Sequence, residues 1–414
     1  MLRILHACRK RGDDVSNHSG REVVILSGAR TPIGSFEGEI AKLPATELGA
    51  VAIRGALRRA GVDAAQIDEV LMGMVLQAGA GQAPARQAAL KAGIPATVGA
   101  ATINKVCGSG MKAAMLGSQA IRVGDADLIV AGGMENMYQA PYTLPGARAG
   151  FRLFDKQVVD LAVADGLWCS IEDWHMGSAA EWVADACGIP RDRQDAFALA
   201  SHQKAIAAID SGAFVAEIEP VEVPGRKGAV TRIDTDESPR RDSSLEALGR
   251  LRPAFQKEGG TVTAGNAPGL NAGGAALVLA GADWAAERGH RPMARILGYA
   301  QAAGEAKELF LAPVKGVKRL LEKTGLTLED FDLIEINEAF AAQTLADGDL
   351  LPGWDWDKVN VNGGAIALGH PIGASGARIV VTLMHALAAR GGKRGLATAC
   401  LGGGEAVAMA IELL

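Results

Sequence analysis

Residues 107–133, CGSGMKAAMLGSQAIRVGDADLIVAGG, decide the fold, because their order of features returns in residues 373–404, GASGARIVVTLMHALAARGGKRGLATACLGGG. Both stretches begin with a Gly/Ser turn, continue through one helical segment, turn again at glycine, and end in an apolar strand followed by glycines. A shared order of elements at two distant places in a chain indicates an internal repeat. We therefore predict two similar halves whose strand ends and helix starts meet at one site.

The rest of the chain also alternates strands and helices. Residues 23–26 (VVIL) are typical of a strand, and residues 47–61 (ELGAVAIRGALRRAG) have the Ala- and Leu-rich composition of a helix. This alternation predicts an α/β protein with largely parallel sheets. A polar region punctuated by Pro and Gly, from about residue 140 to about residue 260, predicts a loop-rich insertion.

These patterns divide the chain into three parts. We expect a disordered extension at residues 1–20, a first half at residues 21–290 that contains the inserted loop domain, and a second half at residues 291–414. The extension is basic, as a transit peptide would be, but it also carries Asp13 and Asp14. Transit peptides normally lack acids, so a disordered extension is the favoured interpretation.

Composition excludes several classes of function. Of the 414 residues, 49% are hydrophobic and 21% charged, with a formal net charge of -5. This charge balance predicts no broad basic surface that would bind nucleic acid or anionic lipid. An anionic ligand would therefore have to bind at a local basic patch. The apolar run at residues 272–282 falls short of the roughly 20 residues that a membrane helix needs. We expect neither nucleic acid nor a membrane as a partner.

Cysteine usage indicates a reducing compartment. The number of cysteines is odd, they lie far apart, and no CxxC pair occurs among them; they are Cys8, Cys107, Cys169, Cys187 and Cys400. Reduced thiols in a cytoplasmic protein are the simplest interpretation.

Cys107 is a candidate nucleophile. It lies in NKVCGSGMKAA, after a short strand-like segment and just before a helix. A thiol at a helix N-terminus is close to the positive end of the helix dipole, which stabilises a thiolate. The alternative is a small buried core cysteine.

His370 and Cys400 lie in similar glycine-rich surroundings in the second repeat. His370 is flanked by Gly369 and Pro371, which places it on a turn; the alternative is a core histidine with satisfied hydrogen bonds. Cys400 ends a strand at ATACLGGG, where glycines leave backbone N–H groups free to approach a ligand oxygen.

Two other chemistries fit this part of the sequence less well. Residues 108–113 match the dinucleotide fingerprint GxGxxG/A, but the next strand ends in glycines instead of the acid that binds ribose. Zinc held by Cys107, His370 and Cys400 would need ligands from three separate loops, with no short structural-zinc spacing. We expect no metal and no tightly bound cofactor.

Together the motifs resemble the thiolase family, which includes acetyl-CoA C-acetyltransferases and 3-ketoacyl-CoA thiolases, over about residues 21–414. Nine blocks occur in family order: NKVCGSGMKA, GGMENM, HMGSAAE, DAFALASHQKA, LRPAF, GTVTAGNAPGLN, INEAFAAQ, NVNGGAIALGHPIGASGAR and CLGGG. The resemblance implies a five-layer αβαβα fold of two duplicated halves, with the loop domain inserted in the first half and covering the active site.

The resemblance also implies the chemistry, a reversible Claisen condensation of acetyl-CoA with acetyl-CoA or acyl-CoA, or CoA-dependent thiolysis of a 3-ketoacyl-CoA. Cys107 attacks the thioester, His370 takes its proton, and an acyl-cysteine forms while CoA leaves. Cys400 then removes the α-proton of a second acetyl-CoA, and the carbanion attacks the acyl-enzyme. In the thiolytic direction Cys400 returns that proton.

Two oxyanion holes are implied by the resemblance, because negative charge develops on a thioester oxygen in both steps. One consists of His370 Nε2 and a water held by Asn337, and the other of the backbone N–H groups of Cys107 and Gly402. A simple loop cap is the alternative role for Asn337. Its neighbour Glu338 orients the site.

Coenzyme A thioesters are the implied substrates, and a homodimer or homotetramer is the implied assembly. The matching CoA-binding positions are Leu167, His175 and Met176 along the pantetheine, Arg240 near the nucleotide, and Ala264, Pro268, Ala339 and Phe340 along the tunnel. Arg240 adjoins Arg241, and a solvated charge pair is the alternative for it.

Four residues depart from the common family pattern. Pro268 replaces the usual Ser of GNASG, Ala272 a usual Asp, and Ala247 a frequent Ser, while Phe310 stands where Gly is often found. These changes bear on acyl-chain preference and CoA affinity. The reacting residues are intact.

Related enzymes and a non-enzymatic protein are the competing interpretations. A 3-ketoacyl-carrier-protein synthase or a hydroxymethylglutaryl-CoA synthase has no need of the proton-abstracting Cys400. A thiolase-like scaffold that binds acyl chains without turnover can lose the catalytic residues, which are retained in this chain.

Overall fold

The computed structural model describes residues 20–414, so all but the last residue of the predicted disordered extension lies outside the described residues. Within residues 20–414 the main sheet has nine strands in the order β13-β14-β15-β12-β1-β11-β4-β2-β3. Their bounds are β1 Val23–Arg30, β2 Glu69–Gly73, β3 Gly99–Ile103, β4 Leu128–Asn136, β11 Ala272–Gly281, β12 Ala294–Ala303, β13 Leu333–Ile336, β14 Arg394–Leu401 and β15 Glu405–Leu413.

The sheet consists of two sets of strands joined at one short contact. Strands β1 and β12 pair only through Val24 with Arg295 and Ile25 with Ala294. On one side of this contact lie β11, β4, β2 and β3, and on the other β15, β14 and β13. This arrangement matches the repeat seen in the sequence, since β4 belongs to the first copy and β14 to the second.

The sheet is mixed, so the expectation of largely parallel strands was wrong. Strand β2 runs parallel to β3 and β4, and β13 parallel to β14, but the remaining pairs are antiparallel. For β14 and β15 the antiparallel direction follows from the connection between them. A tight turn at residues 402–404, with Gly403 and Gly404 at positive φ, joins the two strands directly. Strands joined by so short a turn can pair only in the antiparallel direction.

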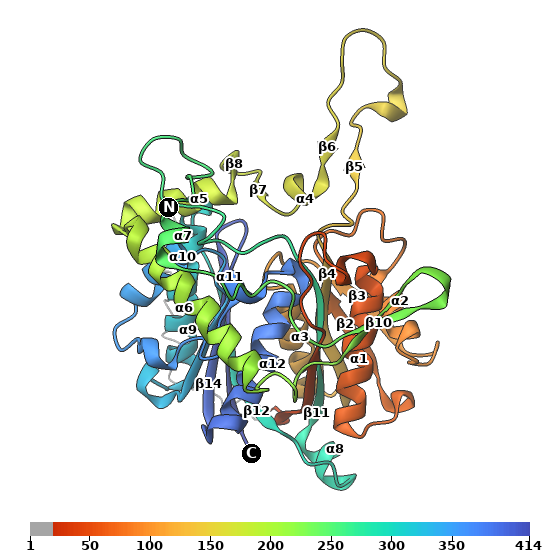
Figure 1. Cartoon of the computed structure of the whole chain (residues 1–414). Helices are drawn as coiled ribbons and strands as arrows, with labels where there is room; N and C mark the ends of the chain where they lie inside the picture. Colours follow the sequence, from red (N-terminus) through yellow and green to blue (C-terminus); the bar gives the residue numbers. More distant parts are fainter. Residues whose placement is uncertain (1–19) are drawn as a thin grey trace, which may run out of the picture.

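Helices and sheets form the five layers αβαβα. Helices α1 (Ala45–Ala60) and α2 (Pro84–Lys91) cover the outer face of the first half, and α9 (Ala312–Thr324) that of the second. Helices α3 (Ser109–Val123) and α12 (Ile372–Arg390) lie between the halves (Figure 1). Side chains of β1 alternate accordingly: Val23 and Ile25 pack in the central core, Val24 and Leu26 in the outer one.

The repeated Gly/Ser motif allows α3 and α12 to approach closely. A Cβ on Gly110 would lie 2.7 Å from the backbone nitrogen of Ala377, and a Cβ on Gly376 would lie 2.7 Å from that of Met111. Each helix therefore presents a glycine to the backbone of the other. This contact brings the N-termini of both helices to the boundary between the halves.

Only one helix of the described part of the chain is long and apolar enough to cross a membrane, and it is α12. Of its apolar window, 83% is buried inside the protein, between the two sheets. A buried core helix commonly has this composition.

The second half lacks a strand where the first half has β3. Among residues 20–414, the outer edge of β13 makes one isolated parallel bridge, between Ile334 and Val359. The Asn360 side chain then pairs with the backbone of Ile336, accepting from its N–H at 2.9 Å and donating to its carbonyl at 2.9 Å. A side-chain amide thus takes the place of a strand at the end of β13.

The insertion between β4 and β11 is more helical than predicted. It contains α4 (Leu161–Ala164), α5 (Met176–Cys187), α6 (Arg191–Asp210) and α7 (Leu245–Gly249). The buried face of α6 includes Gln194, Asp195, Ser201 and His202, so no apolar stripe marks it in the sequence. The insertion's strands are β5 Tyr142–Thr143, β6 Val159–Asp160, β7 Trp168–Cys169, β8 Trp174–His175, β9 Val221–Pro224 and β10 Val230–Ile233.

Strands β5 and β6 form a narrow arm that projects from the body of the protein (Figure 1). The remaining helices are α8 Ala282–Glu287, α10 Ala341–Asp349 and α11 Ala365–Leu368, with 3₁₀ turns at Ile40–Lys42, Ala64–Gln66, Ala147–Ala149, Arg226–Gly228, Ala306–Leu311, Leu328–Asp330 and Trp356–Lys358.

Candidate active site

Cys107, His370 and Cys400 line one cavity of about 380 Å³. Cys107 precedes α3, His370 precedes α12, and Cys400 lies near the end of β14. The packing of the two central helices and the β14–β15 turn therefore bring the three residues together, as the repeat predicted. Gly402 lines the same cavity.

Cys107 follows a strained residue. Val106 has φ of +45°, which is rare for a β-branched side chain and costs on the order of 1–3 kcal/mol. Gly108, on the other side, has no room for a side chain, since a Cβ there would lie 2.4 Å from Leu401 Cδ2. The turn that carries Cys107 therefore packs closely against the end of β14.

Burial raises the pKa of the Cys107 thiol to about 12. Hydrogen bonds from the backbone N–H groups of Cys107 and Gly402 oppose this shift but do not cancel it. The thiolate stabilisation expected from the helix N-terminus is therefore outweighed by desolvation. Cys107 needs a base to remove its proton.

The imidazole of His370 lies in the same cavity with one ring nitrogen free to accept a proton. Its Nδ1 lies 2.6 Å from Ser375 Oγ, and the Ser375 hydroxyl donates to the carbonyl of Pro371 at 2.9 Å. Because the hydroxyl proton is used in that bond, Nδ1 must carry the imidazole proton and Nε2 is the acceptor. Burial lowers the pKa of His370 to about 3, with Arg378 acting in the same direction, so the ring is neutral.

Cys400 is 1% exposed, and burial raises the pKa of its thiol well above the usual value. The negative charges of Cys107 and Asp347 act in the same direction. The two thiols therefore disfavour each other's ionisation, and a thiolate at one of them requires the other to be neutral.

Asn337, at the end of β13, faces His370. Its Nδ2 lies 3.4 Å from His370 Nε2, and its Oδ1 is buried with no protein hydrogen-bond partner in the described part of the chain. Its backbone N–H donates to the carbonyl of Thr398 at 2.9 Å. The loop-cap alternative is not favoured, because the side chain points to the histidine and not to its own loop.

Glu338 connects the Asn337 turn to two other segments. Its carboxylate accepts from Ser201 Oγ on α6 at 2.8 Å, from Asn360 Nδ2 at 2.8 Å and from the N–H of Ile366 at 3.1 Å. Burial raises its pKa. Glu338 thus fixes the segment that leads to His370 but lines no part of the cavity.

The residues expected to bind CoA divide between two adjoining hollows. Six line the catalytic cavity: Leu167, His175, Met176, Pro268, Ala339 and Phe340. Arg240 and Ala264 line a neighbouring groove of about 690 Å³. Residues 267–270, including Pro268, line both, so the two hollows share a wall.

Sequence reasoning missed the role of Glu135. It is fully buried at the end of β4 and accepts from the N–H groups of Val75, Leu76 and Gly373, at 3.0, 3.2 and 3.0 Å. It therefore caps the start of α12 with an acid from the first half. The available signal in the sequence is an acid near the end of an otherwise apolar strand, Glu135 in LIVAGGMEN.

Comparisons with known proteins identify the family of the whole chain. Residues 23–283 match the sequence model of the thiolase N-terminal domain, and residues 290–413 that of the thiolase C-terminal domain. The chain belongs to the thiolase family.

Individual relatives are similar over nearly their whole length. An acetyl-CoA acetyltransferase of Pseudomonas aeruginosa is 56% identical over 94% of this chain and 99% of the relative. One from Cupriavidus necator is 55% identical with the same coverage. The crystal structure of the Bacillus anthracis acetyl-CoA acetyltransferase superposes with a TM-score of 0.93 at 43% identity, covering 95% of this chain and 99% of that one.

Proposed function

We propose that this thiolase interconverts two molecules of acetyl-CoA with acetoacetyl-CoA and CoA. The arrangement of two thiols and a neutral histidine around one cavity carries the proposal. The names of its relatives support acetyl-CoA as the substrate. We place the enzyme in the cytoplasm and in fatty acid metabolism, in keeping with these relatives. The reverse reaction, CoA-dependent thiolysis, is the direction used in β-oxidation.

In the first half-reaction Cys107 Sγ attacks the thioester carbonyl while His370 Nε2 accepts its proton. The pKa of about 12 makes this proton transfer necessary, and the neutral ring makes it possible. The N–H groups of Cys107 and Gly402 point to the sulfur, so they lie beside the carbonyl oxygen that becomes negative. The S–C bond to CoA then breaks, and the thiolate leaves with the proton from His370.

In the second half-reaction the Cys400 thiol passes its proton to His370 Nε2 in the same cavity, and the resulting thiolate removes the α-proton of a second acetyl-CoA. Once acylated, Cys107 can no longer ionise, so a Cys107 thiolate can no longer oppose the ionisation of Cys400. With Nε2 now protonated, His370 and the Nδ2 amide of Asn337, whose nitrogens lie 3.4 Å apart, both donate to the thioester oxygen of the enolate. The enolate carbon bonds to the acetyl carbonyl, the Cys107 sulfur leaves as a thiolate and takes the proton from His370 Nε2, and Cys400 keeps the α-proton, so all three groups return to their neutral forms.

Binding of CoA uses both hollows. We place the pantetheine along Leu167, Met176 and residues 267–270 of the cavity, and the nucleotide near Arg240 in the adjoining groove. The backbone of Arg240 is held by His202, whose Nδ1 accepts its N–H at 3.1 Å.

We further propose a homo-oligomer, a dimer or tetramer. The β5–β6 arm exposes several large apolar side chains, which an isolated protomer would leave in water; they are Tyr142, Leu144, Phe151, Leu153, Phe154 and Val158. Light scattering after gel filtration would measure the assembly.

The direct test of activity is to mix the protein, acetoacetyl-CoA and CoA and to follow the loss of the enolate absorbance. We expect CoA-dependent turnover that disappears in Cys107→Ala. A folded wild-type protein without turnover would contradict the proposed function and favour a non-catalytic acyl-CoA-binding scaffold.

A further inference from the structure

The segment between residues 261 and 271 lines both hollows but has no regular secondary structure. It contributes Ala264 to the outer groove and Pro268 to both hollows. A segment without helix or strand hydrogen bonds must be held by side chains, because unpaired buried backbone groups are costly. The position of this wall therefore depends on the residues that hold it.

Asn266 is the central residue of that support. It is fully buried, and every polar atom of its side chain is used. Its Oδ1 accepts from the N–H of Thr263 at 2.8 Å, and its Nδ2 donates to the carbonyl of Thr261 at 3.0 Å and to Asp195 Oδ1 at 2.9 Å. Because the two ends of the amide face opposite partners, only one orientation of the amide satisfies them.

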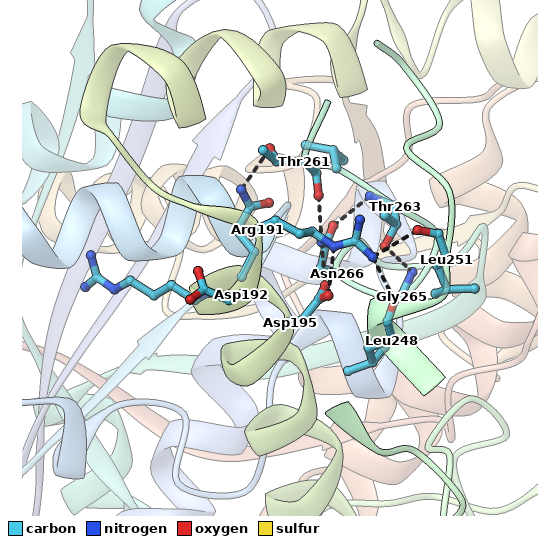
Figure 2. A network of polar contacts seen from close by, with 12 residues as sticks. Arg191, Asp192, Asp195, Leu248, Leu251, Thr261, Thr263, Gly265 and Asn266 are labelled. Atoms are coloured by element: carbon cyan, nitrogen blue, oxygen red, sulfur yellow. Dashed lines mark hydrogen bonds and ion pairs between the residues drawn. The ribbon is translucent and has the colours of Figure 1, made fainter. Parts of the chain in front are cut away.

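An acid and a base from α6 extend the network (Figure 2). Asp195 Oδ2 accepts from Arg191 Nε at 2.7 Å, and Arg191 Nη2 donates to the carbonyls of Leu248 and Leu251 at 2.7 and 3.0 Å. Asp195 is 4% exposed. The charged pair thus holds Asn266 from helix α6 and also fixes the end of α7.

The network reaches the catalytic turn through one backbone hydrogen bond. The carbonyl of Asn266 accepts from the N–H of Ala341 at 3.0 Å. Ala341 is the first residue of α10, so this N–H has no partner within the helix. The turn that carries Asn337 ends there, so the same residue contacts the wall of the CoA site and the turn opposite His370.

We propose that Asn266, held by Asp195 and Arg191, is a positioning residue that sets the spacing between the CoA-binding wall and Asn337. This inference rests on the proposed function. Because Asn337 serves the enolate and not the acyl-cysteine, loss of the clamp slows condensation and thiolysis more than acylation. It also weakens CoA binding, since Pro268 lies two residues away.

The test uses an isosteric change and its reversal. Asn266→Asp turns the donor that faces Asp195 and the Thr261 carbonyl into an acceptor. Combining Asp195→Asn with Asn266→Asp exchanges the two groups. The new amide at position 195 donates to the new carboxylate at position 266, and its oxygen still accepts from Arg191. Asp192→Asn is the matched control: Asp192 is exposed on the same helix and outside the contacts that join Arg191 to Asn266 (Figure 2).

We expect Asn266→Asp to lower kcat for acetoacetyl-CoA thiolysis at least about tenfold and to raise KM for CoA, since small displacements of catalytic groups have large effects. Acylation by saturating acetyl-CoA, measured by intact-protein mass spectrometry, should stay within about threefold of wild type. The kcat/KM of the double variant should be at least about threefold higher than that of Asn266→Asp alone. Asp192→Asn should behave as wild type.

Thermal melting establishes that each variant is folded. If Asn266→Asp does not fold, Asp195→Asn, which disturbs only the contacts of the carboxylate, carries the same comparison of half-reactions. Equal loss in acylation and condensation, or unchanged kinetics in a folded variant, would overturn the positioning role. A wild-type protein without turnover would overturn the proposed function and the clamp together, whereas active wild type with unaffected variants would overturn the clamp alone.

Discussion

Ser375 Oγ lies 2.6 Å from His370 Nδ1, one helical turn into α12. The serine is held in turn by the Pro371 carbonyl, so the hydroxyl can act toward the imidazole only as an acceptor. The tautomer that leaves Nε2 free is therefore set by a residue that does not line the cavity. Ser375 is a positioning residue for the proposed base.

Ser375→Ala should lower kcat without abolishing activity. Removing one neutral hydrogen bond changes the free-energy difference between the two imidazole tautomers by about 0.5–1.5 kcal/mol. This lowers the population of the reactive tautomer about two- to tenfold. Steady-state thiolysis of acetoacetyl-CoA measures it. Ser118→Ala, a buried serine of the other central helix, is the control and should leave kcat unchanged. A variant with unchanged kcat would show that the tautomer does not depend on Ser375.

The two thiols should have separable roles. Cys107→Ala should abolish thiolysis and acyl-enzyme formation, whereas Cys400→Ala should still acylate when mixed with acetyl-CoA, because Cys400 acts only in proton transfer to and from carbon. Intact-protein mass spectrometry distinguishes them. An acetyl adduct on Cys107→Ala, or none on Cys400→Ala, would contradict this division.

The reactivity of Cys107 toward iodoacetamide should rise steadily with pH. With a pKa of about 12, the thiolate fraction grows about tenfold for each pH unit between pH 7 and pH 9. Mass spectrometry of the alkylated peptide gives the rate. A plateau below pH 8 would instead indicate a preformed thiolate paired with a protonated His370.

Phe310 should restrict the size of the substrate. It is 3% exposed, lines the catalytic cavity, and packs edge-to-face on Phe340 with ring centroids 5.3 Å apart. Phe310→Ala should raise kcat/KM for larger 3-ketoacyl-CoA thioesters relative to acetoacetyl-CoA, and should destabilise the fold by about 3 kcal/mol or more through the cavity left behind. Steady-state kinetics with 3-ketoacyl-CoA thioesters of increasing length give kcat/KM for each relative to acetoacetyl-CoA, in the wild type and in the variant. An unchanged ratio in folded protein would place the acyl group elsewhere.

Pro268→Ser should tighten CoA binding with little effect on kcat. A restored hydroxyl can hydrogen-bond to the pantetheine amides, which contributes about 0.5–1.5 kcal/mol, or roughly two- to tenfold in affinity. The contact is equal in ground and transition states, so it appears in KM. Losing proline can cost up to about 1 kcal/mol of stability. A weaker KM in the folded variant would mean that Pro268 is not beside the pantetheine.

The sequence predicted that Cys107, His370 and Cys400 would meet at one site, and the structure places all three in one cavity, because glycine-rich turns before helices and after strands are local signals. Gly110 and Gly376 occur in the internal repeat, and the close packing they permit follows from it. The Asn266 clamp could not be predicted, since its partners come from α6 and α10, far apart in the chain. The strained φ of Val106 likewise has no signature in a valine.

The buried face of α6 mixes polar side chains with alanines, so the sequence does not mark it as a helix. Asp195, Ser201 and His202 are buried because each has a partner in another segment, namely Asn266, Glu338 and the backbone of Arg240. A periodicity of apolar residues cannot reveal a helix whose buried face is polar. The sequence pattern therefore gives no sign of the longest helix of the insertion, although most of the insertion is loop as predicted.

The Asn360 amide that pairs with Ile336 makes the two ends of the main sheet unequal. At the β13 end, a side chain already uses the backbone groups that a further strand would need. At the other end β3 pairs only with β2 among residues 20–414. Strand addition at both ends of a sheet would allow open-ended growth from molecule to molecule. With one end closed, edge-to-edge pairing of this sheet can join at most two copies, which disfavours open-ended growth.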